Sequence, residues 1–183
     1  SLYYTALVTR AYRKRLDALE GRVPETKAEP FAAELSNVAH REFATGFYFS
    51  KDEANKTTVG ETSSPYMLAG TIGKEISGNT EDTALPPAPQ GFHDFEFISM
   101  NKIDAGTPLE YVGPDVLAIE DSDHTLFDPE TGATRAWVCH GHPCILRTSK
   151  PVKDRFIVRA RDPEWTATQD APRPDRTPKS TRA

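Results

Sequence analysis

Hydrophobic residues recur every three or four positions at the start of the chain, which is the spacing of one face of an α-helix. The predicted apolar stripe consists of Tyr4, Val8, Ala11, Tyr12, Leu16 and Leu19. Gly21 and Pro24 end this helix, because glycine accepts a left-handed turn and proline cannot continue the hydrogen-bond ladder. A second helix is predicted to begin at Pro30, since proline is pre-organised for the first helical position, and to end between residues 40 and 43. Its apolar face would consist of Phe31, Leu35 and Val38.

From residue 66 onward the hydrophobic spacing changes to short alternating runs separated by glycine and proline turns. Phe95 and Phe97 would point to one face of a strand, and Glu96 and Ile98 to the other. Strands are predicted at 66–73, 92–100, 109–112, 116–120, 125–127, 135–140, 144–148 and 155–160, with a turn at 101–106. Many short strands at close spacing predict a small antiparallel β-barrel, and the fold class is therefore α+β.

Polar and proline-rich segments separate these parts. Residues 51–65 contain a single valine and are typical of a linker, and residues 78–90 form an acidic, proline-rich loop. The chain has 15 prolines and only 37% hydrophobic residues, and several of the prolines follow residue 160. We therefore expect a helical segment at 1–49, a linker at 50–65, a barrel domain at 66–160 and a disordered tail at 161–183.

The charge balance argues against a protein that coats nucleic acid. There are 22 basic and 27 acidic residues, a formal net charge of -5. A local cluster, Arg10 to Arg15, is interpreted first as a solvated helix face, with Asp17 balancing Arg13. The alternative is a docking surface for another domain or for RNA phosphate, formed together with Arg147, Lys150, Lys153 and Arg155.

Three features of the sequence indicate the cellular compartment in which the protein lies. The chain has two cysteines, too few for a disulfide scaffold, and no apolar run approaches the roughly 18 residues that span a bilayer. The first residues lack the pattern of a signal peptide. We therefore expect a cytoplasmic protein without membrane contact.

Residues 139–144 read Cys-His-Gly-His-Pro-Cys and place four potential metal ligands in one short loop: Cys139, His140, His142 and Cys144. Zinc sites usually pair two ligand-bearing turns that lie far apart in sequence, so a β-hairpin is the simpler interpretation. Its two cysteines would then face each other, near enough for a disulfide only in an oxidising compartment.

One stretch resembles a known family. Residues 34–50, ELSNVAHREFATGFYFS, are similar to the ELxxVSHRxYTTGFYF stretch of the peptidase U32 family, the collagenase-like peptidases and their RNA-modifying relatives. The opening SLYYTALVTRAYRKRLDA resembles SxYYVAxVVRAYRxAIDA, the segment that closes the N-terminal catalytic domain of that family. YMLAGTIG and NKIDAGTPLEYVGP resemble two segments of its C-terminal barrel, which is similar to a barrel of translation elongation factor Tu.

The resemblance, over residues 1–160, implies a C-terminal fragment whose catalytic domain lies elsewhere. His40, Arg41, Thr45, Gly46, Phe47 and Tyr48 would bind substrate or dock that domain. The plain alternative is that His40 caps the helix end and Arg41 makes a salt bridge. Ala39, Phe43 and Ala44 replace the family's Ser, Tyr and Thr, and these lost hydroxyls argue against proton chemistry here.

The relatives include peptidases or collagenases, and also proteins of prephenate-dependent tRNA or rRNA hydroxylation whose N-terminal domain holds an iron–sulfur cluster through cysteines. Those cysteines are absent here, so we expect no cofactor and no catalytic residue in this chain, and no hydrolysis of casein or gelatin by it. The leading hypothesis is an accessory domain that positions a protein or RNA substrate for the N-terminal domain. The alternatives are an RNA-binding module of a hydroxylation enzyme, and a small metal or redox protein built on residues 139–144.

Overall fold

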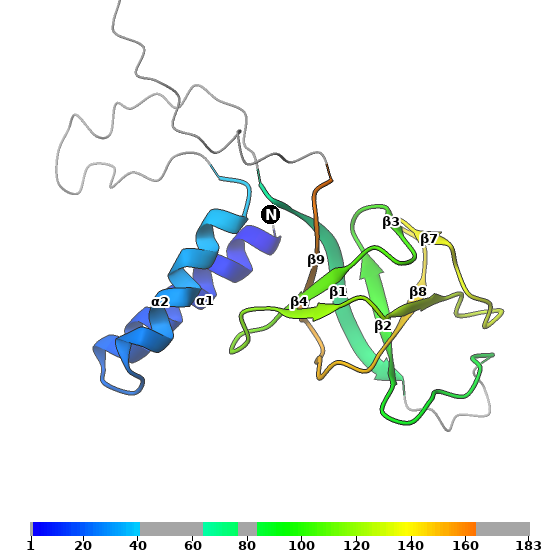
Figure 1. Cartoon of the computed structure of the whole chain (residues 1–183), viewed down its shortest axis with the longest axis horizontal. Helices are drawn as coiled ribbons and strands as arrows, with labels where there is room; N and C mark the ends of the chain where they lie inside the picture. Colours follow the sequence, from blue (N-terminus) through cyan, green and yellow to red (C-terminus); the bar gives the residue numbers. More distant parts are fainter. Residues whose placement is uncertain (1, 41–63, 77–83, 164–183) are drawn as a thin grey trace, which may run out of the picture.

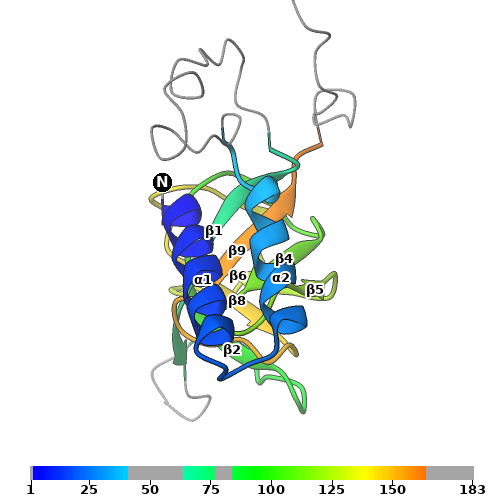
Figure 2. The same cartoon turned by 90° about the vertical axis from the view of Figure 1, so that its left-hand side faces the viewer.

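The computed structural model describes residues 2–40, 64–76 and 84–163. Two helices pack side by side, and both lie against one side of a curled antiparallel sheet (Figures 1 and 2). The helical part consists of α1 (Leu2–Leu19), α2 (Glu25–Ala33) and a 3-10 turn, η1 (Glu34–Asn37). The predicted order of two helices followed by antiparallel strands is confirmed.

The buried face of α1 differs from the predicted stripe. Tyr3, Leu7, Arg10 and Ala11 are buried, whereas Tyr12, Leu16 and Leu19 are 68%, 53% and 69% exposed. The prediction failed because it assigned Arg10 to solvent. Arg10 instead enters the interior, where backbone carbonyls accept its hydrogen bonds, and this turns the helix away from its more apolar side.

The second helix begins earlier than predicted. Pro24, with an extended ψ of 149°, precedes the first helical residue, so the chain enters the helix at Glu25 and Pro30 lies inside it. An interior proline removes one backbone hydrogen bond and usually breaks a helix. Here α2 continues for three residues past Pro30, to Ala33, and the Phe31 ring is buried beneath Arg10 and Lys14.

The sheet has seven strands in the order β5-β4-β9-β1-β2-β8-β6. Their bounds are β1 (Tyr66–Ile76), β2 (His93–Ser99), β4 (Leu109–Val112), β5 (Ile119–Asp121), β6 (Thr125–Phe127), β8 (Cys144–Thr148) and β9 (Ile157–Arg161). A separate ribbon pairs β3 (Ile103–Asp104) with β7 (Trp137–Val138). The predicted turn at 101–106 thus contains a short strand. The predicted hairpin across 139–144 is wrong, since β7 pairs with β3 and β8 pairs with β2 and β6.

The two edges of the sheet are joined by a very short connection. β5 and β6 lie at opposite ends of the strand order, yet only residues 122–124 separate them in sequence. A sheet whose edges are tied by three residues has to curl, and the result is a half-barrel (Figure 1). A carboxylate helps to close it: Asp121 Oδ2 accepts hydrogen bonds from Tyr111 on β4 (2.7 Å) and from Thr148 on β8 (2.6 Å).

The inside of the curl holds the larger hydrophobic core, to which β2 contributes Phe95 and Phe97 as the alternation predicted. The long strand β1 bends through two register shifts, one between Leu68 and Gly70 and the other between Ile72 and Glu75. At Gly70 a Cβ atom would lie 2.3 Å from the carbonyl oxygen of Ile98, so the close approach of the two strands requires glycine.

Two predicted segments lie largely outside the described residues: the linker at 50–65, of which the structure describes residues 64 and 65, and the tail at 161–183 beyond residue 163.

Candidate functional site

Of the six residues that were predicted to bind substrate or dock the catalytic domain, which we call the docking cluster, the structure describes one, His40. His40 is half-buried and follows Val38, which is buried between the helices and the sheet; Arg41, Thr45, Gly46, Phe47 and Tyr48 lie outside the described residues. The residues that flank this segment are linked to each other by a hydrogen bond, which Ser64 Oγ donates to the carbonyl of Asn37 (2.8 Å). The end of the helical part is thereby fixed to the start of β1.

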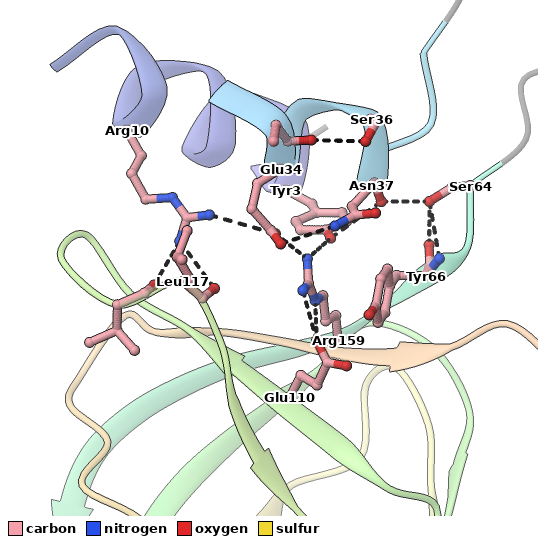
Figure 3. Close-up of polar contacts among 12 residues, drawn as sticks. Tyr3, Arg10, Glu34, Ser36, Asn37, Ser64, Tyr66, Glu110, Leu117 and Arg159 are labelled. Atoms are coloured by element: carbon pink, nitrogen blue, oxygen red, sulfur yellow. Dashed lines mark hydrogen bonds and ion pairs between the residues drawn. The ribbon is translucent and has the colours of Figure 1, made fainter. Parts of the chain in front are cut away.

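The densest polar cluster among the described residues lies where the helices meet the sheet (Figure 3). Its centre is Arg159 on β9, which is 1% exposed. Arg159 Nε and Nη2 contact Glu110 Oε2 at 2.8 and 2.7 Å, and Nη1 donates to Glu34 Oε2 at 2.7 Å and to the hydroxyl of Tyr3 at 3.0 Å. Its guanidinium also lies 3.9 Å from the ring centroid of Tyr66. We call Tyr3, Arg10, Glu34, Glu110 and Arg159 the Arg159 network.

The electrostatics of the network follow from this geometry. Burial disfavours the charged guanidinium of Arg159, but its hydrogen bonds to Glu34 and Tyr3 outweigh burial and raise its pKa above the ordinary value. Burial raises the pKa of the Tyr3 phenol, against the opposing effect of Arg159. Arg159 is therefore a permanent cation held between two carboxylates, and Tyr3 remains a neutral hydroxyl near neutral pH.

A second arginine of the network anchors α1 to a loop of the sheet. Arg10 Nη1 donates hydrogen bonds to the carbonyls of Gly113 (3.0 Å) and Val116 (2.8 Å), and Nη2 lies 3.8 Å from Glu34 Oε2. Burial lowers the pKa of Arg10, and the Glu34 carboxylate partly offsets this. One turn along the helix, Lys14 pairs with Asp115 of the same loop. The helices are thus held by directional polar contacts at several points.

Apolar packing surrounds these contacts. A small core formed by Tyr3, Leu7, Val38, Val112 and Ile157 joins α1 and the end of the helical part to β4 and β9. Both faces of β9 are therefore buried, one in the half-barrel and one under the helices. The chemistry that this arrangement provides is attachment: it contains no nucleophile, and its charged groups are neutralised by one another.

Sequence reasoning missed this network, although one signal was available. Arg159 and Glu110 are directly opposed in the β4–β9 register, an opposite-charge pair of the kind that stabilises strand pairing. No local pattern indicated that Tyr3, Arg10 and Glu34 belong to the network. Arg159 contacts Tyr3 and Glu34 across sequence separations of 156 and 125 residues.

The positive face considered from the sequence is not assembled as predicted. Arg10 and Arg147 are only 5% and 6% exposed. Arg147 makes a bidentate contact with Asp94, at 2.7 and 2.8 Å, and donates to the carbonyl of Pro86. Lys14 and Arg15 are engaged in ion pairs with Asp115 and Glu25. These four cations are thus engaged by partners within the protein, whereas Arg13, Lys153 and Arg155 of the predicted face are exposed.

The side of α1 that faces away from the sheet carries exposed apolar residues. Tyr12, Leu16 and Leu19 follow one another at spacings of four and three residues, so they lie on one stripe. We call them the outer stripe of α1. An exposed stripe at this spacing is typical of a helix that enters an apolar groove on another protein or domain.

The loop at 139–144 brings together two of the four ligands considered from the sequence. Cys139 Sγ lies 3.1 Å from His142 Nδ1, whereas Cys144 points into the core of the half-barrel and His140 is exposed. Both cysteines are free, and burial raises the pKa of Cys144 to about 11. Within residues 2–40, 64–76 and 84–163, no three His, Cys, Asp or Glu side chains gather as a metal site would need.

Comparison with known proteins supports the family resemblance. Residues 1–58 match the model of the family described as Peptidase family U32, as the sequence pattern had predicted. The matched residues include the helical part of this chain, α1 through η1.

Two solved structures are similar to part of the chain. One is described as the C-terminal domain of "Geobacillus thermoleovorans putative U32 peptidase", with 16% identity, a TM-score of 0.36, and coverage of 52% of this chain and 92% of that one. The selenomethionine variant of the same domain has 17% identity, a TM-score of 0.35, and coverage of 51% and 98%. No curated protein matches. In the described parts of the chain, no helix has the length and apolar character needed to cross a membrane.

Proposed function

We propose that this chain is the accessory region of a U32-type enzyme, and that the outer stripe of α1 docks on the N-terminal catalytic domain of that enzyme. The observation that carries the proposal is the position of the U32 match. It covers residues 1–58, and therefore the helix that turns its inner face to the sheet and leaves Tyr12, Leu16 and Leu19 exposed.

The division of α1 into two faces supports this function. Leu7 and Arg10 on the inner face are fixed to the half-barrel, so a domain bound to the outer stripe would be held at a defined orientation to the sheet. An accessory domain that positions a macromolecular substrate needs such a rigid attachment, because misplacement by about 1 Å is enough to slow a reaction substantially. The half-barrel would then present a protein substrate to the catalytic domain. Burial of Arg10 and Arg147 is the reason for preferring protein to RNA.

The docking is tested by calorimetric titration of this chain with a separately produced U32 catalytic domain. Replacing Leu16 by Glu places a charge in the outer stripe, and we expect it to weaken binding by at least about tenfold. Ile98, which is 51% exposed on the sheet, provides a matched control, and Ile98→Glu should change binding by less than about twofold. Equal losses in the two variants, or no binding by the unmodified chain, would refute the proposal.

A further inference from the structure

The two cysteines of this chain occupy opposite environments. Cys139 lies at the surface directly after β7, half-buried, and Cys144 is buried in β8. Burial raises the pKa of the Cys144 thiol to about 11, so at neutral pH this cysteine is almost entirely protonated and inaccessible. Any thiol chemistry of the folded chain therefore falls to Cys139.

The turn at 139–142 places an imidazole on the Cys139 sulfur. The amide of His142 donates to the carbonyl of Cys139 (3.1 Å), Gly141 takes the positive φ of 83° that this turn requires, and Cys139 Sγ and His142 Nδ1 then meet at 3.1 Å. The indole of Trp137 stands edge-on to the imidazole, with ring centroids 5.9 Å apart, and limits its rotation. A nucleophile within hydrogen-bond reach of a base that a third group orients is the arrangement used for thiol activation.

A second contact bears on the proton transfer from the thiol. The carbonyl oxygen of His140 is 3.4 Å from the same Nδ1 atom. A carbonyl can only accept a hydrogen bond, so it would stabilise Nδ1 once that atom has taken the proton of the thiol, and Nδ1 would then also donate to the Cys139 thiolate. The distance also argues against a shared metal ion, because zinc bound to both atoms at tetrahedral angles would hold them about 3.5 Å apart.

Other charges near the loop are already paired. Across the ribbon from Trp137 lies Asp104, which is paired with Lys102 at 3.0 Å, and Arg135 is paired with Asp128 at 2.6 Å. His140 is exposed beside the turn. His142 is thus the group in direct contact with the Cys139 sulfur.

We propose that Cys139 and His142 form a thiol–imidazole pair and that Cys139 is a site of reversible modification by small disulfides. In the reaction, Nδ1 of His142 takes the proton of the thiol, and the Cys139 thiolate attacks one sulfur of the small disulfide. The disulfide bond breaks as the new Cys139–sulfur bond forms, and the departing thiolate takes up the proton from His142 or from water. No electrons are gained or lost overall, and an added thiol reverses the reaction.

The test uses a chromogenic aryl disulfide on the whole folded chain at neutral pH, with the labelled residue located by peptide mass mapping. We expect one fast-reacting thiol, which Cys139→Ser removes and Cys144→Ser leaves in place. His142→Gln should slow the fast reaction by about fivefold or more, whereas the matched change His140→Gln should alter it by less than about twofold. Glutathione disulfide should then add its mass to the same residue, and dithiothreitol should remove it.

Both histidines are exposed, so the two variants should keep the melting temperature of the unmodified chain, and a rate difference between them reports on thiol activation. Equal rates for His142→Gln and His140→Gln would overturn the proposal. Labelling of Cys144 in the folded chain as fast as of Cys139 would overturn it as well.

Discussion

The hydroxyl of Tyr3 accepts a hydrogen bond from Nη1 of Arg159 at 3.0 Å, although 156 residues separate the two in sequence. This contact joins the first turn of α1 to the last strand of the sheet (Figure 3). Through the same guanidinium, Glu34 of η1 and Glu110 of β4 are tied together. The helices and the half-barrel should therefore behave as one folding unit.

Removing Arg159 should be strongly destabilising. Arg159→Met keeps most of the side-chain volume but leaves the carboxylates of Glu34 and Glu110 largely buried beside each other without a cation. Breaking a buried pair in this way costs about 3 to 5 kcal/mol. Urea unfolding followed by circular dichroism measures the change. Lys102→Met removes an exposed ion pair and should cost less than about 1 kcal/mol, and a similar small loss for Arg159→Met would contradict the structural role of the network.

Replacing a leucine by alanine should affect the unfolding free energy strongly on the inner face of α1 and little on its outer face. Leu7 is 1% exposed in the core between the helices and the sheet, and Leu7→Ala should cost about 2 to 5 kcal/mol of unfolding free energy. Leu16 belongs to the outer stripe, and Leu16→Ala should alter stability by no more than about 0.5 kcal/mol. Thermal unfolding of the two variants compares them directly. If Leu16→Ala were the more damaging, the assignment of the faces would be wrong.

Asp121 should contribute more than either hydroxyl that it binds. Asp121→Ala leaves the buried hydroxyls of Tyr111 and Thr148 without their shared acceptor, which should cost about 3 kcal/mol or more. Tyr111→Phe removes one donor while Thr148 still binds the carboxylate, so about 1 kcal/mol is expected. Chemical denaturation of both variants measures the two losses of unfolding free energy. Equal costs would mean that the carboxylate does not link β4 to β8.

Stability should fall on mild acidification because of His124. Burial lowers the pKa of this side chain below 6.5, although Asp121 and Asp123 oppose the shift. The unfolded chain therefore takes up the proton first, and the contribution of neutral His124 is complete above about pH 6.5 and is lost as the pH falls toward the lower folded value.

Unfolding free energies at about pH 7.5 and about pH 5.5 measure this loss, since the carboxylates stay charged over that interval. His124→Phe retains a buried ring without a titrating group and should flatten the dependence. An unchanged slope in His124→Phe would assign the effect to another group.

Most strands could be predicted because their signal is local. The alternation of Phe95 and Phe97 with Glu96 and Ile98 survives in β2, whose buried and exposed positions follow it. The β7 pairing could not be predicted in this way: residues 135–148 carry a hairpin-like pattern, but Val138 finds its partner in Ile103, far back in the chain. The alternation that predicts a strand lies within a few consecutive residues, whereas the partner of that strand depends on contacts with residues distant in sequence.

The buried face of α1 and the polar contacts between the helices and the sheet were harder to predict, because they too depend on contacts between residues distant in sequence. The stripe of α1 was misassigned because a hydropathy pattern places Arg10 in water, and only the carbonyls of Gly113 and Val116 make its burial favourable. Of the docking cluster expected from the U32 resemblance, the described residues include His40 alone. The Arg159 network was found through the structure, since its members are polar residues whose partners lie in distant elements.

Hydrogen exchange of backbone amides tests most directly whether the helices and the half-barrel form one unit. We expect the amides of Leu7 and Ala11 in α1 and of Val158 in β9 to exchange with the same opening free energy, equal to that of global unfolding. If the α1 amides exchanged at an opening free energy several kcal/mol lower than that of Val158, the helices would unfold independently of the half-barrel, and the two would not form one folding unit.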